Sequence, residues 1–141
     1  MSNRWTGLEP AISAFLDDFD ARAGDPDGRP GELFAPTFLA LDPRYAVAIT
    51  AEQFAASLPA RRTMFADAGV RDVRRRDARQ LRLDDQHVLV AGEWAAERDS
   101  GTVELSSTLL VRSGPDGYRV LLYLNHHDIS ALLATPRAEG V

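Results

Sequence analysis

The stretch HVLVAGEWAAERDSGTVELSSTLLVR, residues 87–112, decides the fold class of this chain. Apolar and polar side chains alternate on both sides of the tripeptide DSG at 99–101, which is a turn signal. A period of two residues is typical of a strand with one buried face. The stretch therefore predicts two long strands, residues 87–98 and 102–112, joined as an antiparallel hairpin.

Two further strands flank this hairpin. Residues 70–83 and 118–127 show the same alternation, and the connections DDQ and GPDG are short turns, so the four strands are predicted to form an antiparallel meander. Alternation places one set of side chains on the face toward the helices: Val88, Val90, Trp94, Leu105, Leu109, Val120, Leu122, Leu124 and His126. The opposite face, expected to be a dimer surface or exposed to solvent, collects Glu93, Glu97, Thr108, Tyr123, Asn125 and His127.

Helical patterns come before these strands. Apolar residues at helical spacing predict an amphipathic helix over 8–23. After a loop rich in Gly, Pro and Asp, a short second helix is expected over 30–34. The sequence TAEQ at 50–53 is a capping box, and it predicts a third helix that stops at Gly69.

The remaining segments complete one α+β domain. Residues 38–49 are expected to be irregular chain plus a short strand, and residues 128–134 a closing helix. A chain of 141 residues suits one core, so we expect a single domain over 1–141. The predicted fold class is α+β, with three N-terminal helices packed on a curved, mostly antiparallel sheet of four long strands plus one short strand, and a short C-terminal helix.

Composition excludes several classes of function. The chain has no cysteine, which removes disulfides, thiolate catalysis and thiolate metal ligation. Its net charge of −5 argues against a nucleic-acid partner. No apolar run approaches the ~20 residues of a membrane helix, and the first ten residues lack the features of a secretory signal. We therefore expect a cytoplasmic protein that binds neither nucleic acid nor membrane.

Two motifs and the order of elements resemble a known superfamily. With FAPTFLALDP at 34–43 and GYRVLLYLNHHDIS at 117–130, the chain resembles the nuclear transport factor 2-like (SnoaL-like) superfamily over about residues 11–133. The resemblance implies a cone-shaped fold with a deep pocket between sheet and helices, and a homodimer formed through the outer sheet face. The superfamily includes ketosteroid isomerases, polyketide cyclases, dehydratases and epoxide hydrolases, which implies a small hydrophobic ligand.

Asp42 is the most specific residue that this resemblance singles out. The segment 34–43 looks like the part of ketosteroid isomerases that ends in an Asp-Pro, whose carboxylate removes a proton next to a carbonyl. Those isomerases also use a tyrosine on the first helix, where this chain has Phe15 and Phe19, so steroid isomerase activity is not expected. The alternative is that Asp42 and Pro43 only shape the chain before the short strand.

His126 and His127 lie where the last long strand gives way to a helix. SnoaL-like polyketide cyclases carry an acid/base aspartate near this point, and imidazole titrates near neutral pH. If alternation holds, His126 points into the pocket with Trp94, and His127 lies on the outer face; a bulge at the strand end would reverse this. The alternative is a packing histidine without chemistry, with Asp128 as the N-cap of the last helix. No metal site is expected, because adjacent strand residues point to opposite faces.

These observations favour a small-molecule pocket protein of the SnoaL-like type that acts on an apolar carbonyl compound. If it is an enzyme, Asp42 is the predicted base and His126 the acid or polarising donor, with Tyr45, Trp94 and His127 as substrate-binding residues and no cofactor. Proton abstraction beside a carbonyl covers isomerisation, dehydration and cyclisation. The alternative is a noncatalytic ligand-binding or dimeric interaction module whose pocket is filled by side chains.

Overall fold

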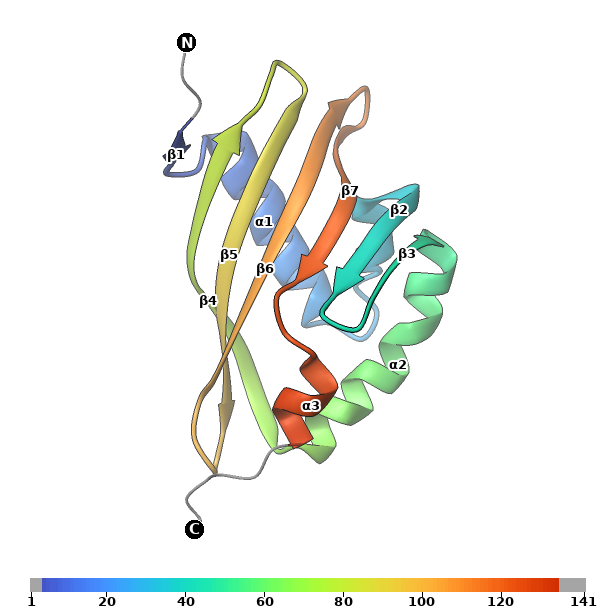
Figure 1. Cartoon of the computed structure of the whole chain (residues 1–141), viewed down its shortest axis with the longest axis vertical. Coiled ribbons are helices and arrows are strands. Elements are labelled where there is room, and N and C mark those ends of the chain that lie inside the picture. Colours follow the sequence, from blue (N-terminus) through green and yellow to red (C-terminus); the bar gives the residue numbers. More distant parts are fainter. Residues whose placement is uncertain (1–3, 135–141) are drawn as a thin grey trace.

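The computed structural model describes residues 4–134 and shows one curved sheet with the helices on one of its faces (Figure 1). In chain order the elements are β1 (Trp5–Thr6), α1 (Pro10–Ala23), η1 (Pro30–Leu33), β2 (Phe34–Asp42), β3 (Tyr45–Thr50), α2 (Ala51–Asp67), β4 (Val70–Arg82), β5 (His87–Arg98), β6 (Val103–Gly114), β7 (Gly117–Asn125) and α3 (Ile129–Ala134). The α+β class expected from the sequence is confirmed.

The sheet is mixed and has seven strands in the described part of the chain. Their order across the sheet is β1-β4-β5-β6-β7-β2-β3. Neighbouring strands run antiparallel, except that β2 lies parallel to β7. The four predicted long strands correspond to β4, β5, β6 and β7, but the prediction of only one additional short strand was wrong.

Of the three additional strands, β1 lies at residues 5–6, where no strand was expected, and the other two lie largely in the segment 38–49, where one short strand was expected. Residues 34–42 form β2, and residues 45–50 form β3, which pairs with it as a hairpin. Pro36 obscured the strand pattern, because proline cannot donate a ladder hydrogen bond. In the structure it falls in the irregular part of the β2–β7 pairing between Phe34 and Leu39, where that donor is not needed.

The prediction of three N-terminal helices was also wrong in detail. The expected second helix is a single 3-10 turn, η1, so the helical layer consists mainly of α1 and α2. The capping box that begins α2 is confirmed, because Thr50 accepts from the backbone of Gln53 and the Gln53 side chain accepts from the backbone of Thr50. At the other end of the chain, Asp128 accepts from the backbone N–H of Ala131 and caps α3.

Two apolar clusters join the helices to the inner face of the sheet. In Figure 1, α1 runs behind β5, β6 and β7, whereas α2 and α3 meet near the lower end of the sheet. The larger cluster joins α1, η1 and β2 to the central strands through buried residues that include Ile12, Leu16, Phe34, Val90 and Leu109. The smaller joins α3 to β5 and β6 through Ala96, Val103, Leu105, Ile129 and Leu133, and partly buried Met64 and Phe65 of α2 pack against it.

A bulge in β7 overturns the predicted sorting of side chains on this strand. Leu110 pairs with Leu122 and Val111 pairs with Val120, so Leu121 is an extra residue. After Leu121, each side chain of β7 points to the face opposite to the one that regular alternation predicts. Tyr123 therefore points inward, where its ring contacts the rings of Phe19, Phe34 and Phe54. Leu122, Leu124 and His126, which were expected to face inward, lie on the outer face.

A polar cluster ties the start of α1 to β4. Gln80 is 1% exposed, its Nε2 donates to Glu9 Oε2, and its Oε1 accepts from the backbone N–H of Glu9. Arg82 donates from both Nε and Nη2 to the same carboxylate. Bidentate, charge-assisted bonds of this kind define one geometry. The cluster therefore sets where α1 enters the helical layer.

We expect Gln80→Ala to lower the free energy of unfolding by about 2 kcal/mol, because it leaves a cavity at a fully buried position and removes the acceptor of the Glu9 backbone N–H, although the Glu9 carboxylate keeps its bonds to Arg82. Urea unfolding followed by circular dichroism measures this. Gln86→Ala is the matched control, since Gln86 is exposed in a turn and makes only a 3.4 Å side-chain contact with Arg112. Equal losses in the two variants would contradict a structural role for the cluster.

Candidate functional site

A hollow of about 440 Å³ lies between the inner face of the sheet, α1 and α2. It adjoins both apolar clusters, since Phe19 of the larger and Leu105 of the smaller line it. Much of its wall is apolar and comes from Phe19, Phe54, Leu58, Trp94, Leu105 and Tyr123. A volume of this size lies in the range of ordinary small-molecule pockets, roughly 300–1,000 Å³.

Helix α2 forms one wall of the hollow and is only partly supported by the rest of the chain. Phe54, Leu58 and Phe65 recur at helical spacing and face the hollow. None of the 17 residues of α2 is fully buried, and Pro59 interrupts its backbone hydrogen bonds. The apolar face of this helix therefore packs only in part against the core, through Phe54 and Phe65, and the rest of it faces the hollow.

Asp20 is the acidic group best placed for chemistry in the hollow. It lies on α1, its side chain is 29% exposed, and it lines the apolar cavity. Trp94 Nε1 donates to its Oδ1 at 2.9 Å, and Arg75 Nη1 lies 2.9 Å from its Oδ2. Burial raises the pKa of Asp20 above its usual value, and the hydrogen bond from Trp94 and the charge of Arg75 oppose this rise without cancelling it.

Arg75 joins β4 to two acids of α1. Its Nη2 donates to Asp17 at 2.9 Å, whereas its Nη1 is close to Asp20 but is not aligned for a hydrogen bond with it. Within the described residues this buried Nη1 has no hydrogen-bond partner. The charge of Asp20 is thus balanced, while its carboxyl keeps hydrogen-bonding capacity for another group.

Two polar residues from neighbouring strands add hydrogen-bonding groups to the wall. Ser107 on β6 and Asn125 at the end of β7 both line the hollow, and Ser107 Oγ donates to Asn125 Oδ1 at 3.0 Å. Within residues 4–134 the amide Nδ2 of Asn125 donates no hydrogen bond, so it can donate to a ligand. Asn125 reaches the inner face only because of the bulge at Leu121.

The structure places Asp42 and Tyr45 outside this hollow, in the turn between β2 and β3. The Asp42 side chain is 6% exposed and accepts from the backbone N–H groups of Arg44 and Tyr45 and from Arg44 Nη2. Burial acts to raise the pKa of Asp42, but these bonds lower it more, so the pKa lies below its usual value. This is the geometry expected if Asp42 shapes the turn.

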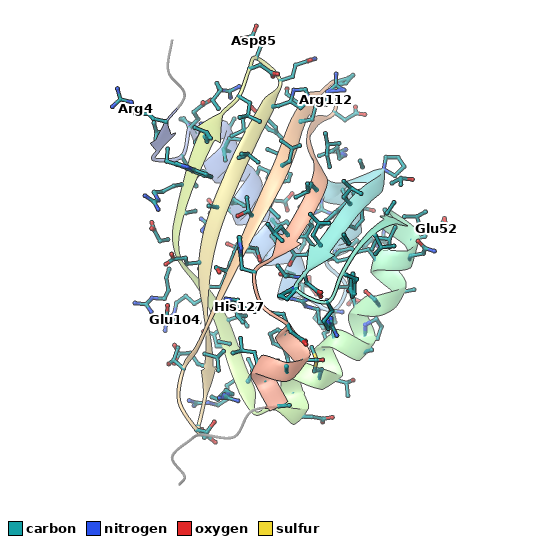
Figure 2. All side chains as sticks on the ribbon, viewed as in Figure 1. Arg4, Glu52, Asp85, Glu104, Arg112 and His127 are labelled. Carbon is teal, nitrogen blue, oxygen red and sulfur yellow. The ribbon has the colours of Figure 1, made fainter. Side chains whose placement is uncertain are left out.

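The two histidines contact the outer face of the sheet. His126 Nε2 lies 2.8 Å from Thr108 Oγ1, and His127 Nε2 lies 3.2 Å from Ser106 Oγ. Figure 2 labels His127 where β7 gives way to the segment before α3. The expectation that His126 points into the pocket was wrong, because the bulge earlier in β7 changes the face. Among the predicted site residues, Trp94 lines the hollow, and Asp42, Tyr45, His126 and His127 do not.

Sequence reasoning missed Asp20 because three aspartates lie close together on α1. Asp17, Asp18 and Asp20 all flank the apolar stripe that contains Phe19. Helical spacing alone does not identify which carboxyl a strand will approach. Trp94 and Arg75, both more than 50 residues away in the chain, select Asp20.

The described residues offer no preformed metal site or membrane helix. Among residues 4–134, no group of three or more His, Asp or Glu side chains is arranged to hold a metal ion. None of the helices in this part of the chain is both long and apolar enough to cross a bilayer.

Solved structures with a similar fold include nuclear transport factor 2-like proteins. One, of unknown function, from Shewanella oneidensis has a TM-score of 0.58 and 14% identity, covering 82% of this chain and 96% of its own. Another, with a cystatin-like fold, from Novosphingobium aromaticivorans has a TM-score of 0.63 and 12% identity, covering 89% and 87%. A candidate ketosteroid isomerase from Parabacteroides distasonis has a TM-score of 0.59 and 12% identity, covering 82% and 83%.

At sequence identities of 12–14%, these similarities show a shared fold and do not show a shared function. No protein-family model matches the sequence, and no curated protein matches it. The expected resemblance is therefore confirmed at the level of the nuclear transport factor 2-like fold, through structure and not through sequence similarity.

We expect Trp94→Phe to raise the pKa of Asp20 further, because the Trp94 N–H stabilises the charged carboxylate. Carbon-13 NMR titration of the Asp20 carboxyl measures this pKa in both proteins. Trp5→Phe is the control, since Trp5 is exposed on β1 and lies outside the hollow. An unchanged or lowered pKa in Trp94→Phe would refute this account of the site.

Proposed function

We propose that this chain, which has the nuclear transport factor 2-like fold, binds a small apolar carbonyl compound in the hollow and that Asp20 exchanges a proton with it. The observation that carries this proposal is the half-buried Asp20 carboxyl, with its raised pKa, on the wall of an apolar cavity. A carboxyl in a dry site is a stronger base than one in water once it is ionised.

The form of the hollow supports the binding part of the proposal. Its wall combines aromatic and aliphatic side chains with a few polar groups, which is the usual composition of small-molecule sites. The α2 side chains Phe54, Leu58 and Phe65 stay half-buried without a ligand. An apolar ligand would remove their remaining surface from water, which is a favourable change.

The polar groups support proton transfer next to a carbonyl. The ionised Asp20 would remove a proton from the carbon beside the carbonyl, while the Asn125 amide would donate to the developing enolate oxygen. The proton would return from Asp20 to carbon or to a leaving group in the second half of the reaction. Isomerisation, dehydration and cyclisation share this first step.

Asp42 and His126 were predicted as base and acid, and both roles stay predictions. Each would require its side chain to reach the hollow, and in this structure neither does. We therefore assign the base to Asp20. A direct comparison of variants at Asp20 and Asp42 distinguishes the two assignments.

Exchange of the acidic hydrogens of 2-tetralone in deuterated water, followed by proton NMR, tests the base without knowledge of the natural substrate. We expect wild type to accelerate this exchange and Asp20→Asn to reduce the acceleration by about 100-fold or more, the usual contribution of a general base. Asp42→Asn should retain it.

Asp18→Asn is the matched control, because Asp18 lies on the same helix and pairs with Arg22 at 3.0 Å instead of facing the hollow. Exchange that survives Asp20→Asn, or that Asp42→Asn abolishes, would overturn the assignment. If wild type binds the ketone without accelerating exchange, the noncatalytic ligand-binding alternative holds.

The outer sheet face favours the second candidate, a homodimeric interaction surface that is compatible with either role of the hollow. One row of directly paired residues crosses six strands: Leu81, Leu89, Leu110, Leu122, Leu39 and Ala48. The adjacent row adds Ala91, Thr108, Leu124, Leu41 and Ala46. We call these two rows the leucine face.

A second copy of the chain would remove the apolar side chains of the leucine face from water. The described helices lie on the opposite side of the sheet, so they leave this face uncovered (Figure 1). Leu39, on β2 next to the edge strand β3, is 45% exposed. Contiguous apolar patches of this kind mark interaction sites, and a two-fold axis pairs like with like.

We expect Leu39→Arg to shift wild-type dimers to monomers in sedimentation velocity, because an arginine on each copy would lose its water inside the interface without a charged partner. Val47→Arg is the matched control: Val47 is 43% exposed but points to the opposite side of the sheet, since it pairs with the inward-facing Ala40. A wild type that is monomeric, or a Leu39→Arg variant that remains dimeric, would rule out this interface.

A further inference from the structure

We propose that the ligand of the hollow is an amphipathic organic acid whose carboxylate binds Arg61 and Arg62. This inference rests on the proposed ligand site and specifies the chemical class that the site accepts. It does not depend on whether Asp20 acts as a base.

Arg61 and Arg62 come from the helix that walls the hollow. Both line the cavity on the same stretch of α2 as Leu58, Phe65 and Ala66. Both are partly buried. Their guanidinium groups therefore stand at the boundary between the apolar wall and water.

Contacts with the protein restrict both guanidinium groups. The guanidinium of Arg61 lies over the Phe65 ring, 5.3 Å from its centre. Arg62 Nη2 donates to the backbone carbonyl of Asp25 at 2.9 Å, in the loop that follows α1. Restricted side chains lose less conformational entropy when a ligand binds, which favours their use as ligand contacts.

Neither guanidinium has a carboxylate partner within residues 4–134. By contrast, eight arginines of the described chain form ion pairs with Asp or Glu, among them Arg71 and Arg75 at the edge of this same region. The chain carries an excess of acidic residues, so carboxylates are abundant. Arg61 and Arg62 line the hollow side by side without a carboxylate partner in the described chain, so their guanidinium groups are available to an anion from outside the protein.

The acids around the hollow do not cancel this positive charge. Asp20 is balanced by Arg75 at 2.9 Å, and it faces α2 from the other wall. Asp72 also lines the hollow, but it is exposed on β4 beside Arg71, which is itself paired with Asp99. The charges left without close partners are thus two arginines and one exposed aspartate, which favours a ligand with one negative charge.

The rest of the hollow determines the body of this acid. The aromatic wall of Phe19, Phe54, Trp94 and Tyr123 suits a flat apolar group. The carboxylate would then lie at the α2 end, and a second polar group of the ligand could reach Asn125 at the sheet end. Guanidinium groups favour carboxylates through paired N–H donors, so a neutral analogue of the same shape should bind less well.

The test compares 2-naphthylacetate, which is ionised near neutral pH, with 2-naphthylacetamide, its neutral analogue. Binding is measured by isothermal titration calorimetry and by quenching of tryptophan fluorescence. We expect wild type to bind the acid about 10- to 100-fold more tightly than the amide, as for a charge-assisted hydrogen bond. Added sodium chloride should weaken binding of the acid more than that of the amide.

The variant Arg61→Gln/Arg62→Gln should lose this preference and keep its affinity for the amide. Arg112→Gln/Arg119→Gln is the matched control, because it removes two arginines of β6 and β7 that also lack ion pairs in the described chain and do not line the hollow. If the double variant does not fold, as judged by circular dichroism, the two single variants and the salt dependence of wild type replace it.

The outcomes separate this inference from the proposed function. Equal binding of acid and amide by wild type, or an acid preference that survives the loss of both arginines, would overturn the inference and leave the ligand site standing. Failure of wild type to bind either probe would overturn both.

Discussion

The rest of this structure depends on one irregularity, the extra residue Leu121 in β7. In an unbroken strand, Leu122 and Leu124 would continue the inner face begun by Val120, and Tyr123 and Asn125 would point outward. The bulge reverses all four. It places an aromatic ring and an amide on the wall of the hollow, and it aligns Leu122 with Leu110 and Leu39 on the opposite face. The candidate ligand site and the candidate dimer surface therefore share one cause.

The hollow persists because the helical layer is unevenly supported. Helix α1 is anchored at its start by the Glu9–Gln80–Arg82 cluster and along its length by buried Ile12 and Leu16. Helix α2 begins with a strong cap but has no fully buried residue. A well-anchored helix and a poorly packed one, placed over the same curved sheet, leave space between them. Ligand binding would complete the packing of α2, which couples the order of this helix to occupancy of the site.

Charge in the hollow is divided between its two walls. On the α1 side, Asp20 is held by Trp94 and Arg75, and its raised pKa reflects burial that those partners only partly offset. On the α2 side, Arg61 and Arg62 have no carboxylate partner in the described chain. A ligand that carries both an acid group and a carbonyl would meet a cation pair at one end and a proton acceptor elsewhere along its length. Because the cations and the proton acceptor lie on different walls, the hollow would hold such a ligand in one orientation.

The sequence by itself determined the α+β class, the four long strands and the capping box of α2, because alternation, turn residues and caps are local signals. The likeness to the nuclear transport factor 2-like fold came from the resemblance of the segments 34–43 and 117–130 and of the order of elements. The sequence also identified Trp94 as an inward aromatic, since no bulge changes its face. One short strand was expected over 38–49, whereas the structure has two; Pro36 obscured the start of the strand at 34–42, and its missing donor matters only in relation to β7. The face of His126 and the choice of Asp20 among three aspartates were decided by tertiary structure alone. An inserted residue changes side-chain direction without a sequence signature, and the pKa of a carboxyl depends on partners brought from distant strands.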